Sequence, residues 1–226
     1  MKKAVTIGIG LCLCTIGLFA QKVETIQVKG DEAAAFISKA TYKFPEFVKA
    51  RVYFKNGDVS AGRFNYDYFN QLMKFIYESG DTLVIANEKD VKFVNLGSDT
   101  FFYDNQYYEW VASAGNARLT SRTTYRLSRK DNVGAYGTSS PAIKVEARDE
   151  ILDNTKYKLK VNEILIFLKE TNYYISSMKG QFVLANKKNI GKLFPGKNIE
   201  DYINQNKLNL NREEDLVNVI AYAGNR

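Results

Sequence analysis

The sequence predicts a mainly β protein in which an antiparallel meander, or a small barrel-like sheet, carries a C-terminal bundle of short helices. Two observations support this fold class. Short stretches that alternate apolar and polar residues recur between turn-forming residues from residue 47 onward, as expected for antiparallel strands with one buried face. From Ile190 onward the apolar residues are instead spaced three and four apart, which is typical of amphipathic helices.

The first half of the chain contains the clearest local signal, a β-hairpin. A short helix is expected at residues 31–40, and Pro45 ends this region. Residues 47–54 then alternate between an apolar face and a face that carries Lys49 and Arg51. Asn56-Gly57 predicts a tight turn with two positive φ angles. The remaining strands are expected at residues 59–64, 72–77, 82–86, 91–94, 100–103, 107–112 and 117–127.

The second half begins with a segment rich in glycine, serine and proline, residues 131–142, which predicts a loop. Strands are expected at 157–161, 164–168 and 173–176. Three short helices around Ile190, Ile199 and Leu216 complete the fold, the last with Asn211 and Glu214 as a capping box and Gly224 at its end. The predicted domains are a signal peptide (1–20), an antiparallel β domain (21–150), and strands followed by a helical tail (151–226).

The N-terminus has the pattern of a secretory signal peptide. Lys2 and Lys3 precede an uncharged apolar run that ends at Ala20. An uncleaved anchor is the alternative. No second long apolar run follows, so no transmembrane span is expected after signal removal. We therefore expect an exported protein that is periplasmic, outer-membrane-associated or extracellular.

The composition argues against several classes of enzyme. The chain has no histidine, and its two cysteines, Cys12 and Cys14, lie inside the predicted signal. The mature chain then lacks the common ligands of zinc and copper and the usual Ser-His and Cys-His pairs. We expect no catalytic residue, metal or cofactor, although carboxylate chemistry is not excluded. The net charge of +7 falls to +5 without Lys2 and Lys3, and this excess favours an anionic partner.

Four basic residues recur at every fourth position along and just beyond the predicted strand 117–127: Arg118, Arg122, Arg126 and Lys130. Alternate positions of a strand share one face, so these side chains predict a basic ladder. A guanidinium binds a phosphate or carboxylate through two parallel hydrogen bonds. We hypothesise an anion-binding face here, with a solvated sheet face as the alternative.

Three aromatic residues that follow a polar turn form a second hypothesis: Tyr107, Tyr108 and Trp110. Their rings are candidates for contact with a ligand. The alternative is that they belong to the core or to a protein interface, because aromatic side chains bury large areas and keep a polar handle.

Several short segments resemble a group of exported Gram-negative proteins of unknown function. They are Tyr42-Lys43-Phe44-Pro45-Glu46-Phe47, Val52-Tyr53-Phe54-Lys55-Asn56-Gly57 and, further on, Gly134-Ala135-Tyr136-Gly137-Thr138-Ser139-Ser140. The resemblance runs from about residue 42 to 140 and more weakly to the end. It implies export and one shared fold, and it identifies no functional residue.

These observations favour a non-enzymatic cell-envelope protein that works in binding or assembly. The expected partner is a protein or an acidic envelope polymer, and no nucleic acid is expected outside the cytoplasm. One alternative is a glycan-processing enzyme, which would need two carboxyl groups about 5–10 Å apart in a groove. The other is a structural subunit of an exported complex, which would expose a large apolar patch.

Overall fold

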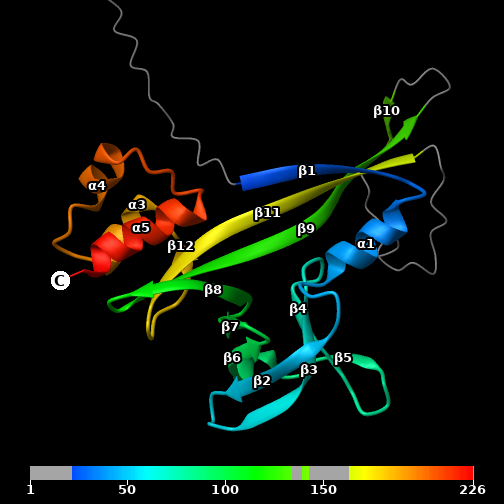
Figure 1. Ribbon diagram of the computed structural model, residues 1–226, viewed down its shortest axis with the longest axis horizontal. Helices are drawn as coiled ribbons and strands as arrows, with labels where there is room; N and C mark the ends of the chain where they lie inside the picture. Colours follow the sequence, from blue (N-terminus) through cyan, green and yellow to red (C-terminus); the bar gives the residue numbers. More distant parts are fainter. Residues whose placement is uncertain (1–21, 134–138, 143–162, 226) are drawn as a thin grey trace, which may run out of the picture.

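The alternating segments of the sequence join into one large, open antiparallel sheet (Figure 1). The computed structural model describes residues 22–133, 139–142 and 163–225. Within them the sheet has twelve strands in the order β1-β11-β9-β8-β7-β6-β2-β3-β4-β5, with β10 on β9 and β12 on β11. The mainly β fold with short C-terminal helices is confirmed. The sheet remains open instead of closing into a barrel.

The strands are β1 (Lys22–Lys29), β2 (Val48–Phe54), β3 (Val59–Asp67), β4 (Leu72–Ile76), β5 (Thr82–Val84), β6 (Val91–Leu96), β7 (Asp99–Tyr103), β8 (Tyr107–Ala114), β9 (Ala117–Val133), β10 (Ser139–Ala142), β11 (Glu163–Ser177) and β12 (Val183–Leu184). The helices are α1 (Ala33–Thr41), the 3-10 helix η1 (Glu88–Asp90), α3 (Lys187–Leu193), α4 (Ile199–Gln205) and α5 (Glu213–Gly224). The predicted signal peptide and the predicted strand 157–161 lie outside the described residues.

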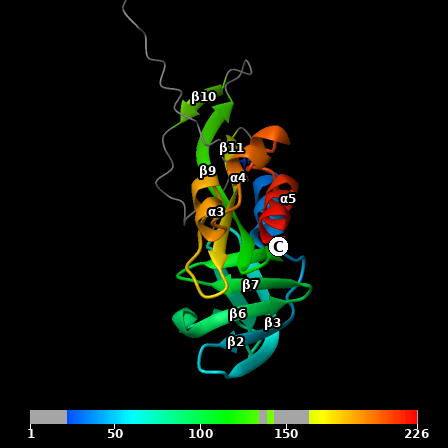
Figure 2. The same ribbon diagram turned by 90° about the vertical axis from the view of Figure 1, so that its left-hand side faces the viewer.

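Most of the sheet consists of two meanders, β2–β5 and β6–β9, which are joined where β2 pairs with β6, and β11 and β1 extend it beyond β9. Figure 2 shows β2, β3, β6 and β7 stacked across the direction of the long strands β9 and β11. The sheet curls until the turn between β3 and β4 reaches β9. There the Tyr125 amide donates to the Tyr68 carbonyl at 3.2 Å, and Gln71 Nε2 donates to the Thr123 carbonyl at 3.1 Å.

Three apolar clusters hold these parts together, all on the face that we call the inner face. One lies inside the curl and includes Val52, Tyr66 and Phe101. Another joins α1 to β1, β9 and β11 around Phe167. In the last, the C-terminal helices cover the end of β8, β9 and β11. Each cluster combines segments far apart in sequence, so burial of apolar area stabilises the curl.

Helix α5 shows how apolar spacing determines this packing. Leu216, Val219, Ile220 and Ala223 are all buried, as their three-and-four spacing predicts. Gly224 is the last residue of the helix, and glycine is needed there because a Cβ would lie 2.6 Å from the Cβ of Ala114 in the sheet. The predicted capping box is wrong, since Arg212 occupies the cap position without a side-chain cap. Three acidic residues in the first turn interact favourably with the helix dipole instead.

Several predicted boundaries are wrong because strand pairing overrides local composition. Strand β1 had no clear signal, and it forms because β11 pairs with it along all eight residues. The predicted loop 131–142 is strand at both ends, since β9 continues to Val133 and pairs with β10. Two predicted strands, 164–168 and 173–176, are one strand, β11. In the β2–β3 hairpin only Gly57 has a positive φ, at 99°.

A partly buried charged group, Lys43, joins three segments near the curl. Its ammonium lies 2.7 Å from Glu109 Oε1 and 2.9 Å from Asp99 Oδ2. Burial alone would lower the pKa of Lys43, but the two carboxylates outweigh burial and raise it. The Tyr68 hydroxyl lies close enough to Lys43 for each group to influence the pKa of the other. Burial is the largest cause that raises the pKa of Tyr68, to about 12.

We expect alkaline pH to destabilise the fold through these groups. In the unfolded chain tyrosine ionises at about pH 10, whereas folded Tyr68 keeps its proton until about pH 12 because its pKa is raised. The folded state therefore binds more protons in this window, and the free energy of unfolding falls as pH rises through it. Urea unfolding at about pH 8 and about pH 11 measures the fall. Tyr68→Phe should show a smaller fall than the wild type, and an equal fall would contradict this assignment.

Candidate functional site

The face of the sheet opposite the inner face, the outer face, carries the most distinctive surface. On β2 the side chains of Ala50 and Val52 point into the curl and are buried. Since side chains alternate along a strand, Lys49, Arg51 and Tyr53 lie on the outer face. Lys49 and Arg51 are exposed, and Tyr53 is half-buried. The alternation that builds the core thus also creates a basic surface.

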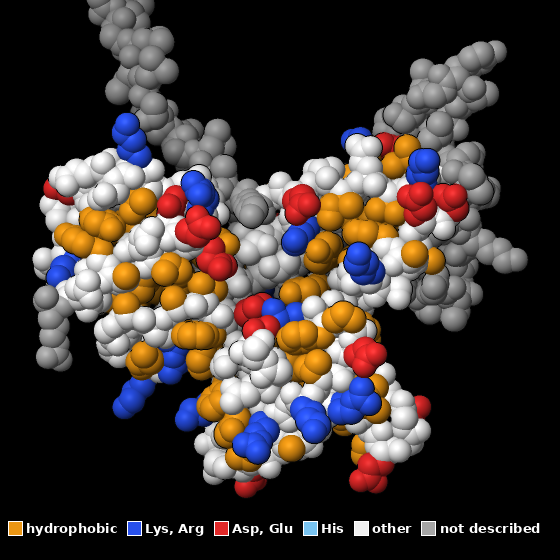
Figure 3. Space-filling model, in the orientation of Figure 1, with side chains coloured by type: hydrophobic (Ala, Val, Ile, Leu, Met, Phe, Trp, Pro, Cys, Tyr) orange, Lys and Arg blue, Asp and Glu red, His pale blue; other side chains and the backbone are white. Residues whose placement is uncertain are grey.

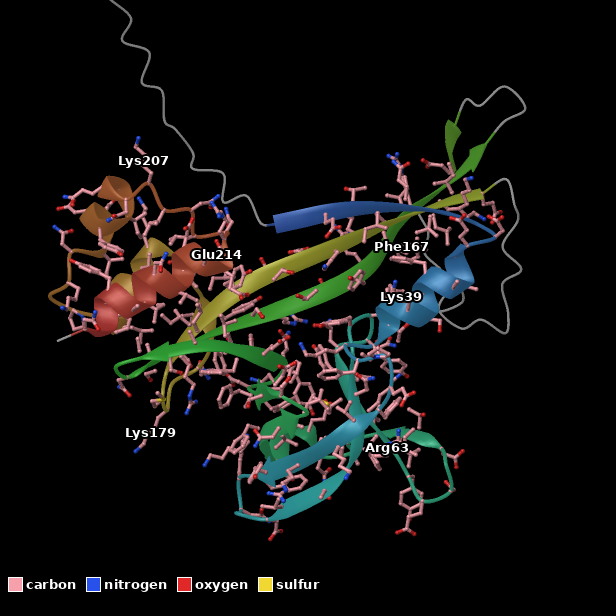
Figure 4. All side chains as sticks on the ribbon, in the orientation of Figure 1. Lys39, Arg63, Phe167, Lys179, Lys207 and Glu214 are labelled. Atoms are coloured by element: carbon pink, nitrogen blue, oxygen red, sulfur yellow. The ribbon has the colours of Figure 1, made fainter. Side chains whose placement is uncertain are left out.

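Positive charges on β2 and β3 are placed close together. Lys49 is directly opposite Arg63 in the register of the two strands, and Arg51 is opposite Ala61. All three basic side chains line one hollow of about 580 Å³ together with Asn95 and Gly97. Figure 3 shows Lys and Arg side chains gathered over β2 and β3, and Figure 4 shows Arg63 there. Like charges in directly opposed positions destabilise a sheet.

A row of aromatic rings leads away from these charges across the outer face. Tyr53 stacks on Phe93 at 4.4 Å between ring centroids, and Phe93 contacts Phe102 at 6.1 Å. Phe182, from the segment after β11, contacts Phe102 at 6.1 Å and stacks on Tyr108 at 4.5 Å. The row crosses β2, β6, β7 and β8, so it runs across the strands.

A second basic hollow lies along this row. The guanidinium of Arg118 sits 4.5 Å above the ring of Phe102, a cation–π contact that fixes its position. The hollow, of about 400 Å³, is also lined by Lys55, Lys92 and Lys179. Its one carboxylate, Asp104, accepts a hydrogen bond from the Phe182 amide at 3.1 Å. We call the row and its two hollows the cationic-aromatic face.

The carboxylates that the structure describes do not neutralise the cations of this face. Some basic side chains of the molecule meet carboxylates, as in Lys74 with Asp67 at 2.8 Å and Lys43 with two acids, whereas others, such as the exposed Lys188 and Lys207, meet none among the described residues. In the parts of the chain that the structure describes, no basic residue of the cationic-aromatic face forms a salt bridge: Lys49, Arg51, Lys55, Arg63, Lys92, Arg118 and Lys179. Their positive potential is therefore available to an external anion.

The structure separates the four residues of the predicted basic ladder. Arg118 belongs to the cationic-aromatic face, whereas Arg122 and Arg126 line another pocket beside the turn between β3 and β4. A register shift between Ile166 and Phe167 leaves Ser128 as an extra residue in β9. Such a bulge reverses which positions share a face. Lys130 therefore lies on the face opposite the arginines, where it pairs with Glu163 at 3.0 Å.

The three predicted aromatic residues also have different positions. Tyr107 is 1% exposed and belongs to the core inside the curl, so its ring is not available at the surface. Tyr108 is part of the aromatic row, and burial raises the pKa of its hydroxyl. Trp110 is 47% exposed, and its indole Nε1 donates to Ser113 Oγ at 3.0 Å. The alternation of β8 explains why Tyr107 faces inward and Tyr108 outward.

Neither a metal site nor a membrane helix is found where the structure is described. Among those residues no group of three or more acidic side chains is placed to hold a metal ion. None of their helices has the length and apolar character to cross a bilayer. No family model, curated protein or solved structure matches the chain. The function of the cationic-aromatic face must therefore be inferred from the positions and charges of its own residues.

Most residues of this face were missed by the sequence-based hypotheses. The outward position of Lys49 and Arg51 was visible in the alternation of residues 47–54. Their proximity to Arg63, and the alignment of rings from β2, β6, β7 and Phe182, depend on strand order. The strand order cannot be predicted from the spacing of neighbouring residues in the sequence.

Proposed function

We propose that the protein is a non-enzymatic binding protein of the cell envelope whose cationic-aromatic face holds an acidic polysaccharide. The observation that carries the proposal is the row of aromatic rings, which has cations at its Tyr53 end and along its middle that form no salt bridge with any described residue. The expectation of export, based on residues 1–20, agrees with this location.

The combination of rings and cations favours a polymer of acidic sugars over other anions. Aromatic rings have flat apolar faces that can pack against sugar rings, and cations bind the carboxylates or phosphates that the sugars carry. A polymer placed along the row would meet Arg51 beside the Tyr53 end and Arg118 beside Phe102 in the middle. Single-stranded nucleic acid uses the same residue types, and export makes it the less suitable partner.

The small number of carboxylates at this face favours binding of a polymer over its hydrolysis. Asp104 is the one carboxylate that lines either hollow, and it already accepts a backbone hydrogen bond. Glycosidic cleavage commonly uses two carboxyl groups that flank the bond. The cationic-aromatic face supports retention of a polymer, and it offers no pair of acids for cleaving one.

Binding to polygalacturonate, a linear polymer with a carboxylate on every sugar, tests the proposal. Isothermal titration calorimetry should show saturable binding that weakens by about 20-fold between about 50 and about 200 mM NaCl, because cations that replace counterions give a salt-dependent affinity. Neutral dextran should not bind. Polyphosphate, which has charge but no rings, should bind more weakly than polygalacturonate.

Other outcomes would reject this assignment. Salt-independent binding would indicate an apolar interface of the kind that a protein partner uses. Tighter binding of single-stranded DNA than of polygalacturonate would indicate a nucleic-acid protein. Absence of binding to every acidic polymer would overturn the proposed function.

A further inference from the structure

A separate polar pocket lies beside the cationic-aromatic face, on the other side of the turn between β7 and β8. It has a volume of about 460 Å³ and is formed by the β3–β4 turn, η1, the β7–β8 turn and β9. Pockets for small ligands span about 300–1,000 Å³, so it can hold one small molecule. Its lining is rich in groups that form hydrogen bonds, including Gln71, Asn105 and Arg122.

Arg122 is held rigidly at this pocket. Its Nε donates to Gln71 Oε1 at 2.9 Å, while Gln71 Nε2 donates to the carbonyls of Tyr68 and Thr123 at 2.6 and 3.1 Å. The two terminal nitrogens of Arg122 form no hydrogen bond with any described residue. A guanidinium fixed through Nε, with both terminal groups free, is prepared to bind a carboxylate.

Backbone strain is concentrated at the same pocket. Gln71 has a φ of 60° and Asn105 a φ of 58°. Only three described residues other than glycine have a positive φ, and two of them line this pocket. A left-handed conformation is costly for glutamine, and such strain persists where the surrounding structure requires a particular geometry, often at binding sites.

The opposite wall of the pocket provides a hydrogen-bond acceptor. Glu88 lines the pocket, and its Oε1 is buried without a hydrogen bond of normal geometry among the described residues. The adjacent Tyr107 hydroxyl, also buried, faces this carboxyl group. Burial raises the pKa of Glu88, and hydrogen bonding from Tyr107 opposes this rise. A partly buried carboxyl group with few hydrogen-bond donors is costly. A ligand that donates hydrogen bonds to Glu88 would reduce this cost.

We propose that this pocket binds a single hydroxylated carboxylate of the uronic acid class. Arg122 and Arg126 hold the carboxylate, Glu88 accepts hydrogen bonds from hydroxyl groups, and the amides of Asn105 and Gln106 contact the remaining polar atoms. The pocket and the cationic-aromatic face use different cations. The inference therefore does not rest on the proposed function, and each can fail without the other.

Binding of the monosaccharide D-galacturonate to the purified full chain tests this inference by isothermal titration calorimetry. We expect saturable binding with a Kd of about 1 mM or below, and at least about 10-fold weaker binding of neutral galactose and of acetate, because each lacks one of the two recognised groups. Arg122→Gln should weaken galacturonate binding by at least about 10-fold, the loss expected for a charge-assisted hydrogen bond.

Further variants separate binding from folding. Arg126 is exposed, so Arg126→Gln should fold normally and also weaken binding. Glu88→Ala, which removes the acceptor, should weaken binding of galacturonate without weakening the binding of acetate. Lys39→Gln, an exposed cation on α1 that lies outside the pocket and forms no salt bridge with a described residue, is the control and should bind normally. The inference is overturned if galacturonate does not saturate the protein at about 20 mM, if galactose binds equally well, or if Arg126→Gln binds like the control.

Discussion

Replacing Lys49, Arg51 and Arg63 together by glutamine is expected to weaken binding of polygalacturonate by about 100-fold. Each cation near an anionic surface contributes about 1 kcal/mol at low salt, and about 3 kcal/mol corresponds to a change of about 100-fold in Kd. The loss should be accompanied by a smaller dependence of affinity on salt, because fewer counterions are released. Titration calorimetry at about 50 mM NaCl measures both effects.

The same triple variant should have about the same stability as the wild type. The register places Lys49 directly opposite Arg63, so neutral side chains remove a repulsion within the sheet. The substitution removes the two hydrogen bonds that the Arg63 guanidinium donates to the Phe47 carbonyl, both at 3.1 Å in an exposed position. We expect a change in the free energy of unfolding within about 1 kcal/mol. A sequence that keeps this repulsion is consistent with a binding role for the three cations.

A matched control distinguishes a local site from a general effect of net charge. Lys188, Lys192 and Lys207 are exposed on or beside the C-terminal helices, and Figure 4 shows Lys207 far from β3. Their replacement by glutamine changes the net charge equally. Binding should remain within about 3-fold of the wild type, since charges farther than the Debye length are screened. Equal losses in both triple variants would contradict a site at the cationic-aromatic face.

The largest expected effect on stability comes from Phe167→Ala. Phe167 is fully buried, and Figure 4 shows it between β11 and α1. Its ring contacts Phe36 of α1 at 4.9 Å and Phe69 of the β3–β4 turn at 5.9 Å. We expect the free energy of unfolding to fall by about 3–5 kcal/mol, because removing the ring leaves a cavity between three segments. Urea unfolding monitored by circular dichroism measures the loss.

Tyr77→Ala provides the control for this substitution. Tyr77 is an aromatic residue that is 52% exposed, after β4. Its removal should change the free energy of unfolding by about 0.5 kcal/mol or less, as is usual for surface positions. A loss below about 1 kcal/mol for Phe167→Ala would show that Phe167 does not connect α1 to the sheet.

The sequence by itself determined the features that depend on neighbouring residues. Alternation in residues 47–54 predicted strand β2 with its basic outer face, and Asn56-Gly57 predicted the hairpin to β3. The three-and-four spacing predicted the buried side of α5. These predictions succeeded because the side-chain direction along a strand or helix follows from local geometry.

Tertiary structure decided everything that depends on a partner strand. Strand β1 exists because β11 pairs with it, and an extra residue at Ser128 reverses the side of the sheet on which Lys130 lies. The curl of the sheet brings Gln71 to Arg122 and so forms the polar pocket. Register, bulges and strand order are set by the summed packing of distant segments. The sequence therefore showed which residues carry charge and rings, and only the fold determined which of them meet.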